Sequence, residues 1–296
     1  MSEQRLKLKQ RLDGGTTTWF AGAQDALSAL LVDQSDFDGV FTTGFGISAA
    51  LLGQPDMELY TLSENLAVVD HIANVVRKPI FADADTGYGN VLNTQRTVRA
   101  FEKAGVAALS LEDQLSPKRC PAAATSLVIL PMADAVAKIR AAVDARRDPN
   151  LLIVARTDAM DAHEALERAA RYAEAGADLI QPITRTFSTY ADLVRLREAC
   201  GRPLSLQLME GTWMATLNRT QIEAVAGLAT YPIVSLLSVA HAMRANLQAL
   251  AARRGDPMGE LPCPRATMNE FKQLIRWHDL ELHQERLELG APASAH

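Results

Sequence analysis

The length, composition and charge of the chain exclude several classes of protein. Its 296 residues carry 30 Lys and Arg against 35 Asp and Glu, a net charge of 30 − 35 = −5, which argues against nucleic acid or an anionic membrane as the main partner. With 48% hydrophobic and 22% charged residues, the chain can bury a large core, so disorder and fibrous repeats are excluded. We therefore expect a globular protein whose partner is a small molecule or another protein.

The N-terminal segment and the cysteines suggest where the protein works. The segment MSEQRLKLKQ has no apolar stretch, and nowhere do about 18 apolar residues follow one another, so we expect no signal peptide, no membrane span and a cytoplasmic location. Cys120, Cys200 and Cys263 form no CxxC pair and predict neither a disulfide framework nor a thiolate zinc site. A functional cysteine would therefore act alone, and Cys200 and Cys263 have no functional interpretation.

Short apolar runs alternate with longer segments of helical period along almost the whole chain. Runs that are apolar on both faces are typical of a parallel sheet covered on both sides. Eight such units without a Pro/Gly/Ser-rich linker favour a closed (β/α)8 barrel, or TIM barrel, over a doubly wound open sheet. The predicted strands are Thr17 to Ala21, Gly39 to Thr43, Pro79 to Ala82, Ala107 to Leu111, Leu151 to Ala155, Asp178 to Pro182, Pro203 to Leu208 and Pro232 to Leu236.

Local signals place helices between these strands. Thr61 with Glu64 three residues later predicts a capping box at a helix start. The related segments FEKAGVAALSLED and YAEAGADLIQPI carry Gly105 and Gly176 where a helix end needs a left-handed residue. Both segments therefore predict a helix that stops and leads into a strand.

The C-terminal part differs from the repeating units. After Leu237 the pattern predicts a helix, then a broken stretch from Arg254 to Arg265, then a last amphipathic helix beginning near Thr267. We expect one (β/α)8-barrel domain over residues 1–296, with about 254–290 as a C-terminal extension and helix for oligomerisation. This helix either packs in the outer ring of the barrel or docks on another subunit.

Acidic residues follow two neighbouring predicted strands. Reactive groups of such barrels collect at the carboxyl ends of the strands. Asp83 and Asp85 are two residues apart and face the same way, and Glu112 ends the next strand. Converging carboxylates repel one another unless a hard cation lies among them, and Mg2+ or Mn2+ fits oxygen ligands. We favour a metal site over the alternative of helix N-caps and a salt bridge to Arg156.

Two other strand ends offer groups for an anionic substrate. Arg156 ends the apolar run LLIVA, where its guanidinium either binds a substrate carboxylate or pairs with Glu112 or Asp158. The Thr43-Gly44 turn offers backbone N–H groups and a hydroxyl to an anionic oxygen, although a glycine also simply serves to turn the chain.

Cys120 lies in a long loop, Gln114 to Ala124, that follows the fourth predicted strand. Lys118 and Arg119 beside it predict a lowered thiol pKa, which suits a proton donor or acceptor on a mobile lid. The alternative is an incidental loop cysteine beside two solvated basic residues.

Four motifs in this order resemble the isocitrate lyase and phosphoenolpyruvate mutase superfamily. They are DADTGYGN at Asp83 to Asn90, LEDQ at Leu111 to Gln114, PKRC at Pro117 to Cys120 and ARTDA at Ala155 to Ala159. The resemblance implies a Mg2+-dependent (β/α)8 barrel that binds a 2-oxo acid or its enolate on the metal. It also implies exchange of the eighth helix between partners and assembly as a dimer of dimers, a homotetramer.

The resemblance assigns roles to the acidic residues and to the turn after the second strand. It implies that Asp85 is the main Mg2+ ligand, that Asp83 and Glu112 hold metal waters, and that Asp56 belongs to the metal shell. A second set of positions matches residues that bind the substrate carboxylate and the enolate oxygen: Thr43, Gly44, Phe45, Arg156 and Gln207, the last standing where Asn is usual.

The lid sequence favours one reaction class within this superfamily. Cys120 matches the cysteine of carbon–carbon lyases that protonates the enolate product, and Lys118 precedes it in the same catalytic loop. Mutases, phosphonopyruvate hydrolases and simple oxaloacetate decarboxylases generally lack this cysteine. The resemblance therefore implies a lyase.

The chain also departs from the lyase pattern. Pro121 and Ala122 follow the lid cysteine in place of Gly-His, Phe41 replaces a tyrosine, and Ile183 follows Gln181-Pro182 where lyases often carry a Pro-Glu pair. Fewer charged groups remain for a second and a third carboxylate. A smaller or more apolar substrate than isocitrate is expected.

We expect a Mg2+-dependent carbon–carbon lyase that cleaves a substituted 2-hydroxy di- or tricarboxylate of the 2-methylisocitrate or dimethylmalate type. The product would be a 2-oxo acid such as pyruvate, formed via an enolate. One alternative is decarboxylation or hydrolysis of oxaloacetate or another 2-oxo acid. Another is a weakly catalytic 2-oxo-acid-binding member of the family.

Overall fold

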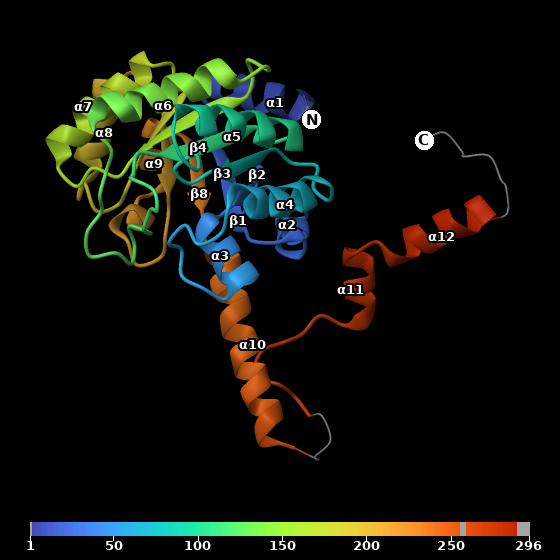
Figure 1. Ribbon diagram of the computed structural model, residues 1–296. Coiled ribbons are helices and arrows are strands. Elements are labelled where there is room, and N and C mark those ends of the chain that lie inside the picture. The colour runs from blue at the N-terminus through green and yellow to red at the C-terminus, as the bar shows by residue number, and fades with distance from the viewer. Residues whose placement is uncertain (1, 255–258, 289–296) are drawn as a thin grey trace. The chain divides into compact units, whose positions relative to one another are not determined.

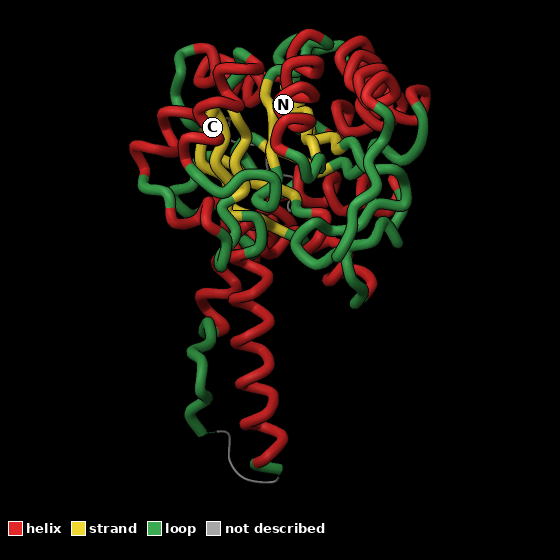
Figure 2. Tube along the Cα trace, turned by 90° about the vertical axis from the view of Figure 1, so that its left-hand side faces the viewer, coloured by secondary structure: helices red, strands yellow, loops and turns green. Residues whose placement is uncertain are grey.

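Eight parallel strands form a closed barrel with helices around it, in a computed structural model that describes residues 2–254 and 259–288 (Figures 1 and 2). Each strand pairs with the next in the chain, and β8 pairs with β1. The predicted (β/α)8 barrel is thus confirmed. The strands are β1 (Thr18–Ala23), β2 (Gly39–Thr42), β3 (Ile80–Asp83), β4 (Ala108–Glu112), β5 (Leu152–Thr157), β6 (Leu179–Pro182), β7 (Leu204–Gln207) and β8 (Ala226–Tyr231).

The helices begin and end where local capping predicts. Glu64 accepts hydrogen bonds from the N–H and the hydroxyl of Thr61, and Gly105 and Gly176 are left-handed, with φ of 98° and 100°. The helices are α1 (Ser2–Asp13), α2 (Ala26–Asp33), α3 (Gly44–Leu52), α4 (Leu62–Ala73), α5 (Val91–Ala104), α6 (Met132–Ala145), α7 (Ala162–Glu174), α8 (Tyr190–Cys200), the 3-10 helix η1 (Trp213–Thr216), α9 (Arg219–Val225), α10 (Val234–Ala252), α11 (Met268–Leu274) and α12 (Trp277–Glu288).

Large apolar side chains fill the inside of the barrel. Phe20, Phe41 and Phe81 point inward and pack on one another. The ring centroids of Phe20 and Phe81 are 5.8 Å apart, and those of Phe41 and Phe81 are 4.9 Å apart. Leu8 of α1 is 1% exposed and belongs to the same cluster. The barrel interior is therefore a solid core that leaves room for a cavity only toward its carboxyl end.

The same alternation brings polar side chains to the carboxyl end. Successive side chains of a strand point to opposite faces, so a polar residue two positions after an inward apolar residue also points inward. Asp83 follows Phe81 in this way, and Arg156 follows Val154. In the register of the sheet, Arg156 of β5 lies beside Glu112 of β4 on one side and beside Gln181 of β6 on the other. Strand geometry thus forms a ring of charged and amide side chains above the apolar core.

The predicted eighth strand is wrong. The strand lies at β8 (Ala226–Tyr231), and the predicted range, Pro232 to Leu236, instead contains the start of α10 at Val234. Pro232 has no N–H to continue a ladder and here ends the strand. The small residues of β8 weaken its strand signal but are required by packing, because a Cβ on Gly227 would lie 2.3 Å from Leu12.

The single last helix expected from the sequence is two helices. The first begins after the N-cap Thr267, as predicted. Arg276 then adopts a left-handed conformation with φ of 55°, which separates α11 from α12. An α-helix cannot continue through such a residue.

The chain divides into two units, residues 1–236 and 237–296. The first contains the whole barrel. Among the described residues, α10, α11 and α12 bury no side chain, and no helix there has the length and apolar character to span a membrane. The expectation of one domain over residues 1–296 stays a prediction.

Candidate active site

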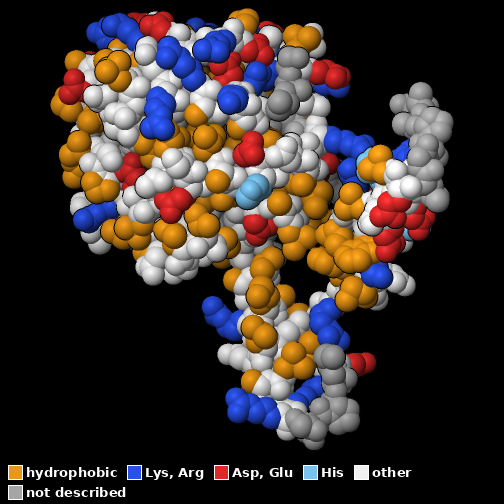
Figure 3. Space-filling model, turned by 45° about the vertical axis from the view of Figure 1, so that its right-hand side comes forward, with side chains coloured by type: hydrophobic (Ala, Val, Ile, Leu, Met, Phe, Trp, Pro, Cys, Tyr) orange, Lys and Arg blue, Asp and Glu red, His pale blue; other side chains and the backbone are white. Residues whose placement is uncertain are grey.

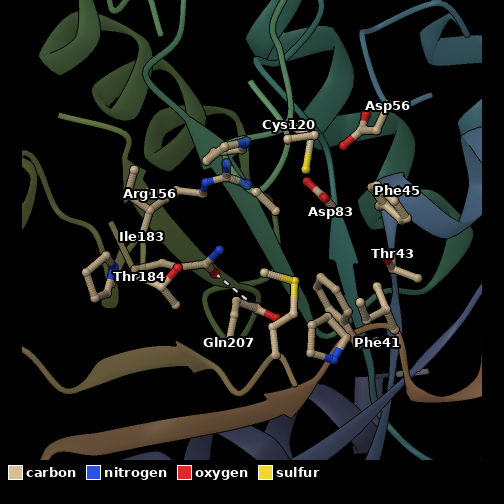
Figure 4. A pocket seen from close by; sticks show the side chains of 18 residues that line it. Phe41, Thr43, Phe45, Asp56, Asp83, Cys120, Arg156, Ile183, Thr184 and Gln207 are labelled. Carbon is tan, nitrogen blue, oxygen red and sulfur yellow. Dashed lines mark hydrogen bonds between the residues drawn. The ribbon is translucent and has the colours of Figure 1, made fainter. Parts of the chain in front are cut away.

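A cavity of about 280 Å³ lies at the carboxyl end of the barrel (Figure 4). The structure brings all the predicted site residues to it. Those lining it directly are Thr43, Phe45, Asp56, Asp83, Cys120, Arg156 and Gln207. The other four are bonded or ion-paired to lining residues: Gly44, Asp85, Glu112 and Lys118.

The turn after β2 is formed by the start of α3. Thr43 is the N-cap of this helix, and its hydroxyl accepts a hydrogen bond of 3.4 Å from the N–H of Gly46. The N–H of Gly44 lies 3.4 Å from Asp83 Oδ2. A Cβ on Gly44 would lie 2.7 Å from the hydroxyl of Tyr60 and 3.0 Å from Asp83. Glycine is therefore needed here because the Tyr60 hydroxyl and the Asp83 carboxylate approach the backbone closely.

Asp85 is held rigidly in the turn after β3. It is fully buried and has a left-handed φ of 49°. Its Oδ2 accepts hydrogen bonds from the hydroxyls of Tyr60 at 2.7 Å and Tyr88 at 2.8 Å. Its Oδ1 lies 2.9 Å from Nζ of Lys118. Such a strained residue persists only where its surroundings fix it, which is common at functional sites.

Lys118 is the cation at the centre of the acidic group. Its side chain is 1% exposed, and Nζ lies 2.6 Å from Asp56 as well as 2.9 Å from Asp85. Burial alone would lower the pKa of Lys118, but the charges of Asp85, Glu112 and Asp56 outweigh burial and raise the pKa well above its usual value. The ammonium thus compensates two buried carboxylates.

Arg156 compensates the other side of the acidic group. Its Nε and Nη2 lie 2.7 and 2.9 Å from the two oxygens of Asp158, and Nη1 lies 2.8 Å from Glu112 Oε2. Of the five guanidinium N–H groups, these contacts leave two for a ligand. The predicted internal pairing and the predicted substrate role are therefore compatible.

The donor set fits a hard divalent cation. Asp85 Oδ1 and Glu112 Oε2 are buried and accept no hydrogen bond of normal geometry; each instead faces a cationic nitrogen. Carboxylate oxygens of this kind are what Mg2+ prefers. As the side chains stand, no three acidic, histidine or cysteine groups among the described residues converge on one metal position. Lys118 must move from Asp85 for a cation to bind that oxygen.

The predicted lowering of the Cys120 pKa is wrong. Burial raises the pKa of this thiol, the charge of Asp56 raises it further, and Lys118 and Arg156 oppose these effects only in part. The thiol points toward Asp83 in the cavity (Figure 4). Cys120 therefore stays protonated at neutral pH, as a proton donor must, whereas the sequence neighbourhood of Lys118 and Arg119 suggested a thiolate.

Glu58 is a site residue that the sequence did not reveal. Its Oε1 accepts a 2.7 Å hydrogen bond from the hydroxyl of Thr86 in the Asp85 turn, and its Oε2 accepts one of 2.7 Å from the N–H of Lys118. One carboxylate thus clamps the loop carrying Cys120, residues 114–131, to the turn carrying Asp85. Glu58 also has a left-handed backbone with φ of 55°, a strained conformation that persists only where the surroundings fix the residue. No residue spacing in the sequence predicts this role of Glu58.

The loop carrying Cys120 is held at two further points. The N–H of Cys120 donates a 3.1 Å hydrogen bond to the carbonyl of Asp56. Nη1 of Arg185 donates to the carbonyls of Pro121 at 3.0 Å and Ala124 at 2.6 Å. These contacts hold Pro121, Ala122 and Ala123 against the cavity. The loop therefore covers the cavity as a lid.

Gln181 is a second lining residue that the site prediction omitted. It is 3% exposed, and its Oε1 accepts hydrogen bonds from Ser205 at 3.3 Å and from Nε2 of Gln207 at 3.4 Å. The inward alternation of β6 could have identified it, because it lies two positions after the inward residue Leu179.

Comparisons with known proteins identify the family of this chain. The sequence signature of the phosphoenolpyruvate phosphomutase family spans residues 8–253. A 2,3-dimethylmalate lyase of Eubacterium barkeri is 36% identical over 273 residues, which cover 91% of this chain and 93% of the relative. A 2-methylisocitrate lyase of Aeropyrum pernix is 37% identical over 286 residues, covering 93% and 88%.

A solved structure is similar throughout. The crystal structure of a phosphonopyruvate hydrolase in complex with oxalate and Mg2+ has a TM-score of 0.84 and 26% identity, and the match covers 96% of this chain and 98% of that one. The chain belongs to the phosphoenolpyruvate mutase and isocitrate lyase family, as its motifs implied. Within this family of enzymes, it is a carbon–carbon lyase.

The charge of Asp83 should weaken the metal-free protein. Burial, and then the charge of Asp85, raise its pKa to about 6, so the folded state disfavours the ionised carboxylate. The destabilisation by the Asp83 charge is fully present above about pH 6. It disappears as the pH falls toward 3.8, the ordinary pKa of an Asp side chain in the unfolded chain. In EDTA at pH 8, Asp83→Asn should raise the free energy of unfolding by up to about 3 kcal/mol.

Urea denaturation of both proteins between pH 4 and pH 8 checks this expectation. The difference between them should shrink steadily below pH 6, whereas Asp144→Asn at an exposed position should differ from the unaltered protein equally at every pH. A difference for Asp83→Asn that does not depend on pH would contradict the argument.

Loss of the Glu58 clamp should free the lid. Glu58→Gln keeps the size of the side chain but removes the charge that strengthens the bond to the N–H of Lys118. Hydrogen exchange followed by mass spectrometry should show roughly tenfold faster exchange in the lid, residues 114–131, for a loss of about 1.4 kcal/mol. Exposed Glu198→Gln is the matched control. Unchanged lid exchange in Glu58→Gln would show that the clamp does not hold the loop.

Proposed function

We propose that the protein is a Mg2+-dependent lyase that cleaves a substituted 2-hydroxy di- or tricarboxylate of the dimethylmalate or 2-methylisocitrate type into a 2-oxo acid and a second carboxylic acid. The observation that carries this proposal is the position of the Cys120 thiol, which points into the cavity beside Asp83 and whose pKa is raised by burial. A carbon–carbon lyase needs an acid there, because the carbon released by cleavage must gain a proton.

The cavity offers two places for the carboxylates of such a substrate. The turn of Thr43, Gly44 and Phe45 would hold the half that bears the hydroxyl and the first carboxylate, through N–H groups at the start of α3. The two remaining N–H groups of Arg156 would bind the second carboxylate. Amides of Gln181 and Gln207 lie on the same ring of strand ends and would complete this second position.

Asp85, with Asp83 and Glu112 through water and Asp56 nearby, would hold Mg2+ or Mn2+. The cation would supply a Lewis acid that stabilises negative charge developing on the substrate oxygen. Lys118 would leave Asp85 when the cation binds. It would then remain near Asp56 as a positive charge beside the reacting groups, which agrees with its predicted catalytic position.

The residues of the chain account for the proton movements of a retro-aldol cleavage. Asp56 and Asp83 are the carboxylates that line the cavity, and both have a raised pKa because they are buried, which suits acceptance of the hydroxyl proton near neutral pH. The carbon–carbon bond then breaks and its electron pair passes to the carbon next to the second carboxylate. Cys120 donates its proton to this carbon while the lid excludes water.

The test compares the unaltered protein with Cys120→Ser on a panel of substituted malates, citrates and oxaloacetate, in the presence of Mg2+. Release of 2-oxo acid and CO2 is followed. Loss of the acid should lower kcat on a substituted malate by about 10² to 10⁴-fold. Cys263→Ser is the matched control, because Cys263 lies outside the barrel unit, and it should keep full activity.

Two outcomes would favour the alternatives. Turnover of oxaloacetate alone, at a rate unchanged in Cys120→Ser, would replace the lyase with a decarboxylase or hydrolase. Mg2+-dependent binding of a 2-oxo acid in calorimetry, without turnover of any compound, would identify a weakly catalytic binding protein.

We also propose that the protein works in the cytoplasm as a homotetramer, a dimer of dimers that exchanges a C-terminal helix. Apolar side chains of the C-terminal helices are widely exposed (Figure 3), with Leu247 of α10 at 60% and Leu280 of α12 at 66%. Exposed apolar groups in such numbers mark an interaction surface. A second copy of the chain would cover them.

Light scattering should give a mass near four times 32.1 kDa. The double variant Leu247→Lys and Leu280→Lys should dissociate to smaller species, because buried charges oppose an apolar interface. Leu92→Lys, at a residue of α5 that is 70% exposed, should keep the full mass. A monomeric unaltered protein would contradict the proposed assembly.

A further inference from the structure

The cavity has one charged side and one apolar side. Asp56, Asp83 and Cys120 lie at one end, and Phe41 lies at the other (Figure 4). The apolar side is supplied by Phe41 from β2, together with side chains that follow β6, β7 and β8: Ile183, Met209, Pro232 and Ile233. Four strands therefore contribute apolar side chains, which we call the apolar wall; the neutral polar side chains of Gln181, Thr184 and Gln207 line the cavity among them.

The lid extends this apolar surface over the cavity. Pro121, Ala122 and Ala123 line the cavity from above, and Arg185 holds their backbone through the carbonyls of Pro121 and Ala124. Nη1 of Arg185 is thus engaged with the lid, and the side chain is not among those that line the cavity. A ligand group beside the apolar wall would meet hydrocarbon on the lid as well.

The cations near the cavity leave no counter-charge for a further carboxylate. Arg156 is the only cationic side chain among the described residues that line the cavity, and three of its five N–H groups already contact Asp158 and Glu112. Lys118 is not among the residues that line the cavity, and its ammonium lies 2.6 Å from Asp56. A carboxylate against the apolar wall would lose its hydration without gaining a counter-charge.

From these observations we infer that the site is specific for substrates that carry an unbranched alkyl group on the carbon bearing the second carboxylate. This inference rests on the proposed lyase function and names its substrate class. The alkyl group would contact Phe41, Ile183 and Met209. A carboxymethyl group at the same carbon would be rejected.

The chemistry of this substrate class is a balanced cleavage. In a 3-alkyl-2-methylmalate, the hydroxyl proton leaves, the bond between the second and third carbons breaks, and the oxygen forms the carbonyl of pyruvate. The electron pair passes to the third carbon, which takes a proton from Cys120. The second product is an unbranched monocarboxylic acid that contains the alkyl group and two further carbons.

The experiment measures kcat/KM of the full-length protein with Mg2+ on 2-methylmalates whose third carbon carries hydrogen, methyl, ethyl, propyl or carboxymethyl. Each methylene transferred to the apolar wall should raise kcat/KM about fourfold. The carboxymethyl compound, close in size to the propyl compound, should be cleaved about a hundredfold less efficiently than propyl.

Variants locate the selectivity at the wall. Ile183→Ala should reduce the preference for propyl over hydrogen several-fold. Ile183→Lys places a cation beside the wall and should shift the ratio of carboxymethyl to propyl cleavage toward carboxymethyl by about a hundredfold. Leu92→Lys, at the exposed position on α5, is the matched control and should leave both ratios unchanged.

The outcomes separate this inference from the lyase proposal. Equal cleavage across the series, or a preference for carboxymethyl, would overturn the inference while the lyase proposal stands. No cleavage of any member would overturn both. A preference for propyl that persists in Ile183→Ala and Ile183→Lys alike would also overturn it, because the selectivity would then arise elsewhere.

Discussion

The ion pairs of two buried cations hold together the carboxyl end of this barrel. Lys118 contacts Asp56 and Asp85, and Arg156 contacts Glu112 and Asp158. Carboxylates at this density would not stay ionised in a buried site without counter-charges, and removal of one partner of a buried pair typically costs about 3–5 kcal/mol. The positions of the lid, of the Asp85 turn and of Arg156 all depend on these contacts.

The apolar core below this layer makes such an arrangement tolerable. Phe20, Phe41 and Phe81 fill the barrel interior, so water cannot reach the ion pairs from the amino end. Their low-polarity surroundings strengthen the pairs and raise the pKa of Asp83 to about 6. The same surroundings keep the thiol of Cys120 protonated. A site that can both accept and donate a proton therefore follows from burial combined with a few fixed charges.

The lid joins reactivity to selectivity. Its backbone is bonded to Glu58, Asp56 and Arg185, so the loop that presents the acid of Cys120 also presents small apolar side chains to the cavity. Closure would place the proton donor and exclude water in one movement. On the proposed function, Pro121 and Ala122 would make the lid apolar beside the substrate while the acid, Cys120, is kept.

Strand alternation explains why so much of the site was predictable. Once β3 and β5 are identified, the inward direction of Asp83 and Arg156 follows from the period of two. The eighth strand was misplaced because a proline can mark either end of a strand. Pro79 and Pro203 precede strands, whereas Pro232 follows one. The missing N–H is the same in both settings and does not tell them apart. The break at Arg276 was missed because arginine has no intrinsic preference for the left-handed conformation.

The sequence by itself determined the barrel, the ring of polar strand ends and the family, because these depend on local periodicity and on short motifs. Only the tertiary structure decided the protonation of Cys120, the clamp by Glu58 and the ion pair between Lys118 and Asp85. Each of these depends on burial and on distances between residues far apart in the chain: Glu58 and the N–H of Lys118 are separated by 60 positions. Charge near a residue in sequence predicts little about its pKa when burial and a distant carboxylate, here Asp56, are the larger effects.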